Sequence, residues 1–180
     1  ELLEDVSWPT PLADLLEDQN TFVLDFLRPE QQRGVSRLGR PLEPEARVVL
    51  TVRLDLEDRN FHWETKRNPG SDHFFNTAVR PSNRGVGRDT ASSDGFEFVP
   101  APDRQLRVWT PSGRFQHDPE WAMNIPHPVE ASRGQEGSGD AYSPGWFELP
   151  LLAGGDATLV GTSESADPDR EVIAGAMEAR

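Results

Sequence analysis

Residues 48–56 carry the pattern that most constrains the fold of this chain. The segment reads VVLTVRLDL, so apolar side chains occupy every second position from Val48 to Leu56, with Val49, Thr51, Arg53 and Asp55 between them. A period of two places successive side chains on opposite faces of a strand. The pattern therefore predicts a strand with one buried face and one wet face, as is typical of antiparallel sheets.

Further short segments predict strands, and turn signals such as Asn68-Pro69-Gly70 and Asp94-Gly95 separate them. These segments are 21–27, 61–65, 73–79, 96–99, 106–110, 121–125, 146–151 and 158–163. The 16 Pro and 15 Gly among 180 residues favour many short strands over a helical bundle. The sequence thus predicts a mainly β protein with an antiparallel, supersandwich-like β-sandwich.

A short helix is predicted near each end of the chain. Thr10 as N-cap and Pro11 at the first helical position predict a helix over 11–17. Asp167 and Pro168 predict another over 168–178, which we interpret as an interdomain connector. The expected organisation is a loosely ordered segment with a short helix at 1–20, a β-sandwich at 21–166, and at 167–180 the start of a connector towards a catalytic domain.

The charge of the chain argues against two classes of partner. Its 31 acidic and 18 basic residues give a net charge of −13, which repels nucleic acid and anionic membranes. No apolar run approaches the roughly 20 residues that a membrane span needs. The absence of cysteine removes disulfides and thiolate metal sites, so the simplest location is the cytoplasm.

Metal-dependent catalysis has one weak candidate. His62 and Glu64 would share a face of a strand and could meet His73 if the strands that carry them pair. The spacing matches no standard ligand pattern, so ordinary surface residues are the favoured interpretation. The chain also has no Gly-x-Ser-x-Gly elbow. We expect no catalytic residues, no bound metal and no cofactor.

Five large aromatic residues stand beside polar or turn residues rather than within apolar runs: Trp63, Trp109, Trp121, Tyr142 and Trp146. Flat aromatic faces stack on the C–H faces of sugar rings, while neighbouring polar groups bind the hydroxyls. Packing in the core is the alternative for most of them. Trp121 and Trp146 are the preferred sugar contacts.

Three ordered stretches carry a resemblance to a known family. They are Arg59-Asn60-Phe61-His62 leading to Asp72-His73-Phe74-Phe75; FEFVPAPDRQL at 96–106 followed by Pro119-Glu120-Trp121, Asn124, Pro126, Glu130 and Arg133-Gly134; and Tyr142-Ser143-Pro144-Gly145-Trp146-Phe147 followed by Leu159-Val160 and Thr162-Ser163-Glu164. Over 48–165 the chain resembles the N-terminal domain of bacterial and archaeal glycogen debranching enzymes of the amylo-α-1,6-glucosidase type. It departs from the family at Ala122, where Tyr is usual, and at Asp140-Ala141, where an acidic pair is usual.

The resemblance implies a β-sandwich that precedes an (α/α)6-barrel and helps to shape its glucan groove. The catalytic carboxylates would lie on the barrel, and the parent enzyme would hydrolyse α-1,6 branch linkages of glycogen or related α-glucans. The expected partners are therefore glycogen, maltooligosaccharides and the intramolecular barrel. The candidate glucan contacts are Trp121, Asn124, Trp146, Tyr142 and Trp63.

Two alternatives stay open. The chain could be a free-standing carbohydrate-binding or interaction module. It could also be a small metal-dependent enzyme of β-barrel type that uses His62, Glu64 and His73.

Overall fold

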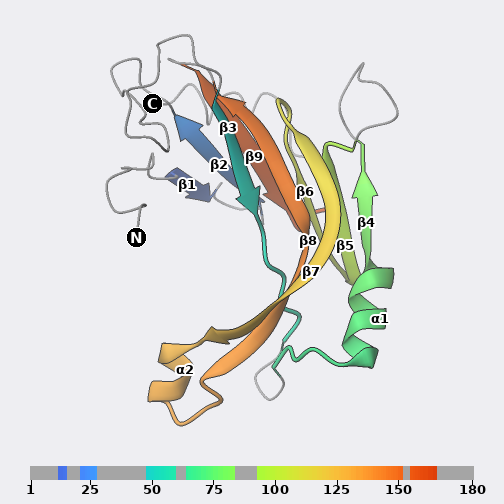
Figure 1. Cartoon of the computed structure of the whole chain (residues 1–180), viewed down its shortest axis with the longest axis vertical. Helices are drawn as coiled ribbons and strands as arrows, with labels where there is room; N and C mark the ends of the chain where they lie inside the picture. The colour runs from blue at the N-terminus through green and yellow to red at the C-terminus, as the bar shows by residue number, and fades with distance from the viewer. Residues whose placement is uncertain are drawn as a thin grey trace.

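The computed structural model of the protein describes residues 48–59, 64–83, 93–151 and 155–165, and the backbone alone of 12–15 and 21–27. The described strands form two antiparallel sheets that face each other (Figure 1). In sheet order, the six-stranded sheet contains β1 (Leu12–Leu15), β2 (Thr21–Leu27), β9 (Asp156–Thr162), β6 (Arg104–Trp109), β5 (Gly95–Ala101) and β4 (Val79–Ser82). The three-stranded sheet contains β3 (Val48–Arg53), β8 (Ser138–Leu151) and β7 (Arg114–Pro126). The predicted antiparallel β-sandwich is confirmed.

The alternating segment forms the edge of the smaller sheet. Val48, Leu50 and Val52 of β3 are half-buried, whereas the intervening Val49, Thr51 and Arg53 are exposed, as the alternation predicted. Val52 pairs with Phe147 and Leu50 with Leu149, so apolar side chains of both strands share the inner face. The strand itself ends at Arg53, although Leu56 still forms an isolated bridge to β8.

Aromatic rings join the two sheets. Phe96 of the larger sheet lies 5.3 Å from Phe115 and 6.1 Å from Phe147, both in the smaller sheet (ring centroids). Buried aliphatic residues surround this group: Leu56, Val79, Val108, Leu149, Leu151, Ala157 and Leu159. The core therefore consists mainly of inward positions of strands, together with Leu56 and with Phe75 of the helix Pro69–Ala78.

The strand predicted over 73–79 is wrong, because these residues belong mostly to helix α1 (Pro69–Ala78). The Asn68 side chain caps the helix by accepting from the backbone N–H groups of Gly70 and Ser71. Pro69 at the first helical position and Asp72 in the first turn also favour a helix start. The turn predicted at Asn68-Pro69-Gly70 is wrong, because these residues form the beginning of this helix.

The helix predicted over 11–17 is also wrong where the structure describes it. Residues Leu12–Leu15 form β1, which pairs with β2 from Leu12 opposite Asp25 to Leu15 opposite Phe22. A seven-residue helix is marginal in water, whereas strand pairing satisfies the backbone groups directly. The helix predicted over 168–178 lies outside the described residues, as does most of the strand predicted over 61–65.

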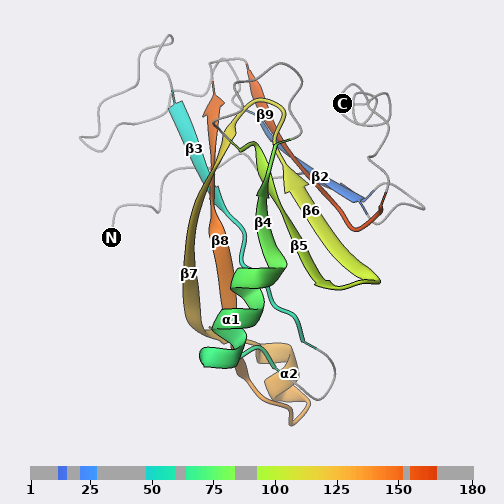
Figure 2. The ribbon, with the colours of Figure 1, turned by 90° about the vertical axis from the view of Figure 1, so that its right-hand side faces the viewer.

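Two strands extend beyond the sandwich. β7 and β8 run together past its end and are joined through helix α2 (Pro128–Ser132) (Figures 1 and 2). Helix α1 lies beside the point where they leave the sandwich (Figure 2). Neither helix in the described ranges is long and apolar enough to cross a membrane.

Candidate functional site

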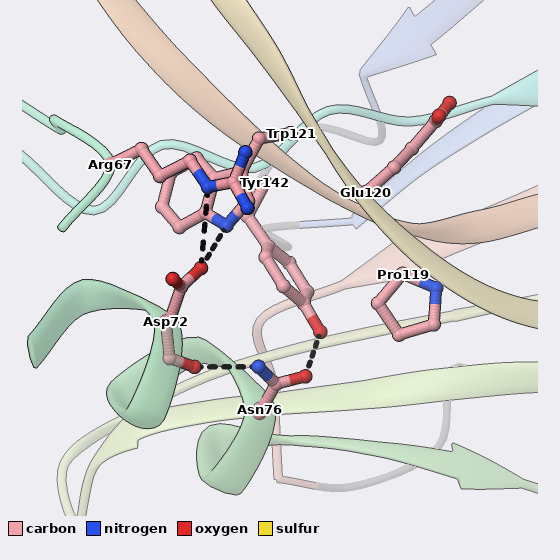
Figure 3. Close-up of a pocket in the computed structure, with 7 residues that line it drawn as sticks. All are labelled: Arg67, Asp72, Asn76, Pro119, Glu120, Trp121 and Tyr142. Atoms are coloured by element: carbon pink, nitrogen blue, oxygen red, sulfur yellow. Dashed lines mark hydrogen bonds and ion pairs between the residues drawn. The ribbon is translucent and has the colours of Figure 1, made fainter. Parts of the chain in front are cut away.

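An open hollow of about 730 Å³ lies where α1 meets β7 and β8 (Figure 3). We call it the Trp121 hollow, and its lining residues are Arg67, Asp72, Asn76, Pro119, Glu120, Trp121 and Tyr142. Two aromatic residues thus meet four residues with polar or charged side chains.

The Trp121 indole is held between the helix and the sheet. Its ring meets the rings of Phe75 and Tyr142 edge to face, at 5.4 and 5.6 Å. The indole nitrogen Nε1 donates to Asp72 Oδ1 at 2.6 Å. Because the side chain is only half-buried and lines the hollow, part of it stays accessible to a ligand.

Phe75 explains why α1 lies at this place. Its ring is buried and stacks on Phe98 of β5 at 5.5 Å and on Tyr142 of β8 at 5.0 Å. One helical side chain therefore fills the space between the two sheets and fixes the position of Asp72, one turn earlier in the helix.

Tyr142 forms the floor of the hollow. Only 1% of the residue is exposed, and its hydroxyl donates to Asn76 Oδ1 at 2.9 Å. The Asn76 amide nitrogen in turn donates to the Asp72 carbonyl oxygen at 2.7 Å. Burial, and then the nearby Asp72 carboxylate, raise the pKa of Tyr142 above its usual 10.0.

The Asp72 carboxylate connects the two sides of the hollow. Oδ1 accepts from the Trp121 indole and lies 3.7 Å from Arg67 Nε. The Asp72 side chain is 39% exposed, and Oδ2 has no protein partner among the described residues. The hollow therefore offers a carboxylate oxygen and a guanidinium group next to an aromatic ring.

Asp140 joins two segments behind the hollow. It is 3% exposed, and its carboxylate accepts from the backbone N–H groups of Arg67 and Asn124, both at 2.9 Å. The hydrogen bond from Arg67 and, to a smaller extent, that from Asn124 lower the pKa of Asp140 below its usual 3.8. Because Arg67 lines the hollow, Asp140 helps to fix its wall.

Of the candidate glucan contacts, the structure brings Trp121 and Tyr142 together. Asn124 is exposed at φ 57° on β7 and does not line the hollow. Trp146 is half-buried on β8, opposite Arg53, with its indole nitrogen 3.4 Å from Glu148 Oε1. Trp63 lies outside the described residues.

The metal candidates are only partly described. Glu64 lies 3.4 Å from the Lys66 ammonium group, His73 is exposed on α1, and His62 lies outside the described residues. In the part of the chain that the structure describes, no three His, Asp or Glu side chains are grouped to hold a metal. The described strands form two open sheets rather than the closed barrel that the metal-enzyme alternative assumed.

Sequence reasoning missed Arg67, Asp72, Asn76 and Glu120 as members of this site, although Asp72 and Glu120 stand in the stretches that carry the family resemblance. The available signal was the run from Asn68 to Asp72, which has the composition of a helix N-terminus. A helix there would have placed Asp72 and Asn76 one turn apart on one face.

The fold and the hollow define an antiparallel β-sandwich domain with an open aromatic and polar surface site. The family model described as "Glycogen debranching enzyme N terminal" matches residues 35–158, and the chain belongs to this family. The resemblance predicted from the sequence is thereby confirmed. Searches of curated proteins and of solved structures returned no significant match.

Proposed function

We propose that this domain is the accessory N-terminal domain of a glycogen-debranching glycoside hydrolase and that its Trp121 hollow contacts α-glucan. The observation that carries the proposal is the family match over residues 35–158. The parent enzyme cleaves α-1,6 branch linkages of glycogen or related α-glucans in the cytoplasm. The sandwich occupies residues 21–166 in this proposal.

The chemistry of the hollow supports contact with sugar. The half-buried Trp121 ring provides an apolar surface for the C–H face of a pyranose, and Asp72 and Arg67 provide an acceptor and donors for hydroxyl groups. Glucan is uncharged, so the net charge of −13 does not oppose its binding.

Catalysis is assigned to a separate (α/α)6-barrel. A general acid in glycoside hydrolysis needs a raised carboxyl pKa. Among the described residues, the carboxyl pKa values that are displaced, those of Asp140 and Glu130, are both lowered. These two groups therefore suit structural hydrogen bonding and not proton donation.

Maltoheptaose binding to the 180-residue chain tests the glucan contact. We expect a saturable change in tryptophan fluorescence at millimolar sugar, confirmed by calorimetry. Trp121→Ala should weaken binding by about fivefold or more, because truncating an aromatic anchor removes most of its contact area. Trp146→Ala is the matched control and should bind like the wild type. A flat titration, or equal loss in the two variants, would refute a glucan contact in this hollow.

The downstream reading frame tests the parent enzyme. A following run of ~350–450 residues with helical-pair periodicity would support the barrel. A stop codon shortly after Arg180 would favour the free-standing module instead.

A further inference from the structure

The two oxygens of the Asp72 carboxylate have different surroundings. Oδ1 accepts the Trp121 indole N–H at 2.6 Å, whereas Oδ2 has no protein partner in the described ranges. Because the indole N–H lies in the plane of the ring, this hydrogen bond restrains the rotation of the ring about its Cβ–Cγ bond. The edge-to-face contact with Phe75, which is on the same helix as Asp72, provides a second restraint.

The backbone of Asp72 is itself well fixed. Its N–H donates to the Asn68 carbonyl oxygen at 2.8 Å, and its carbonyl oxygen accepts from the Asn76 side chain at 2.7 Å. Buried Phe75 anchors the same helical turn between the two sheets. A carboxylate on such a rigid element can hold a neighbouring ring in one orientation.

Most other polar groups of the hollow are already used within the protein. Both ends of the Asn76 amide are engaged, by Tyr142 and by the helix backbone, and Glu120 forms an ion pair with Arg53. Of the described lining groups, Asp72 Oδ2 and the terminal nitrogens of Arg67 remain available to a ligand.

A carboxylate acceptor beside a guanidinium donor is complementary to two adjacent hydroxyl groups. One hydroxyl donates to the carboxylate oxygen, and its neighbour accepts from the guanidinium N–H. A glucose residue linked through C1 and C4 keeps its adjacent hydroxyls at C2 and C3 free. Its C–H face is free to stack on an aromatic ring at the same time.

We propose that Asp72 has two roles in the hollow: it orients the Trp121 ring through Oδ1, and with Arg67 it binds the C2–C3 diol of an α-1,4-linked glucose residue through Oδ2. The proposal rests on the glucan contact proposed above. It makes Asp72 the residue that couples aromatic stacking to hydroxyl recognition.

Two substitutions separate these roles. Asp72→Ala removes both oxygens, so the indole N–H resonance of Trp121 should shift to higher field in the NMR spectrum. The affinity for maltoheptaose should fall about tenfold, which corresponds to the loss of one charge-assisted hydrogen bond. Asp72→Asn keeps an oxygen for the indole but replaces the charged acceptor. Its indole resonance should stay near that of the wild type while affinity still falls severalfold. Trp121→Phe assigns the resonance, and exposed Asp118→Ala is the matched acidic control that should change neither reading.

Three results of these experiments would each contradict a different part of the proposal. If Trp121→Ala loses binding but both Asp72 variants bind like the wild type, Asp72 does not recognise the sugar. If the indole resonance is unchanged in Asp72→Ala, Asp72 does not orient the ring. If the wild type binds no maltoheptaose, the proposed glucan contact fails, and the indole resonance still decides the orienting role.

Discussion

Replacing Asp140 with alanine should destabilise the domain by about 3 kcal/mol, because it leaves two backbone N–H groups without their acceptor. The residue is 3% exposed, and its carboxylate accepts from the backbone N–H groups of Arg67 and Asn124, each at 2.9 Å. A hydrogen bond to a charged group contributes about 1.5–3 kcal/mol, and we take the lower end because both hydrogen bonds are only partly buried. The sum over two donors gives the predicted value.

Thermal unfolding measured by circular dichroism checks this magnitude. For a domain of this size the loss corresponds to a decrease in Tm of about 6–12 °C. Asp140→Asn can still present one oxygen to one of the two N–H groups, so we expect about half the loss. Asp118→Ala is the control, since Asp118 is exposed and makes no described hydrogen bond or ion pair.

The pH dependence of the stability provides an independent test of the role of Asp140. The pKa of Asp140 in the folded state lies below its usual 3.8, so its contribution to stability is present above that value and is lost as pH falls through the folded pKa. The difference in Tm between wild type and Asp140→Ala should therefore be largest near neutral pH and shrink below pH 3.8. If Asp140→Ala melts with the Asp118→Ala control at neutral pH, the carboxylate does not hold the two segments together.

Three further predictions concern residues that line the hollow or support the sheets and the helix around it. Tyr142 is the only tyrosine in the sequence, so a titration followed by ultraviolet absorbance reports a single phenol. Its midpoint should lie above pH 10.0 in the folded protein and near pH 10.0 in denaturant. The contribution of the neutral phenol to the stability of the fold is therefore present below pH 10.0 and is lost as pH rises through the pKa of the folded state. Asp72→Asn should move that midpoint back towards 10.0, and an unchanged midpoint would contradict the charge contribution of Asp72. Gly145→Ala should destabilise the domain by about 4 kcal/mol in urea unfolding, because φ is 140° and a Cβ would collide with the Gln116 carbonyl oxygen; a neutral effect would refute this geometry. Phe75→Ala should cost about 3–5 kcal/mol in the same assay, and a loss below that range would mean that α1 is not anchored by this ring.

Local sequence patterns predicted the strands well where apolar residues alternate or run together. The prediction for 21–27 matches β2, and the alternation from Val48 describes β3 and its burial. In β3 the strand period and the burial pattern carry the same information, so no tertiary contact is needed to choose the structure.

The helix α1 shows where local information was insufficient. Asn-Pro-Gly fits a turn and a helix start equally well, and the following DHFF is compatible with a strand. The helix is decided by the Asn68 cap and by the burial of Phe75 between Phe98 and Tyr142. That burial depends on residues more than 20 positions away, which a local pattern does not contain.

The hollow could be predicted only in part for a related reason. Trp121 and Tyr142 were each candidates from their polar neighbourhoods, but their proximity follows from the β7–β8 register, in which they are direct partners. A shift of one residue would place them on opposite faces. Asp72 joins them only because α1 is a helix and lies at this end of the sandwich.

The backbone around Trp121 is irregular, and this irregularity affects the direction of the side chain. The β7–β8 register shifts twice, between His117 and Glu120 and between Ala122 and Ile125, so Trp121 stands between two bulges. Such irregularities interrupt ladder hydrogen bonds and redirect side chains, and the second one contains Asn124 at φ 57°, a left-handed conformation that asparagine adopts more readily than most residues. The Asp140 carboxylate accepts the Asn124 N–H and so helps to hold this conformation. The two register shifts therefore set the direction of the Trp121 ring, and this side chain lines the hollow, which is the geometry that the proposed ligand contact requires.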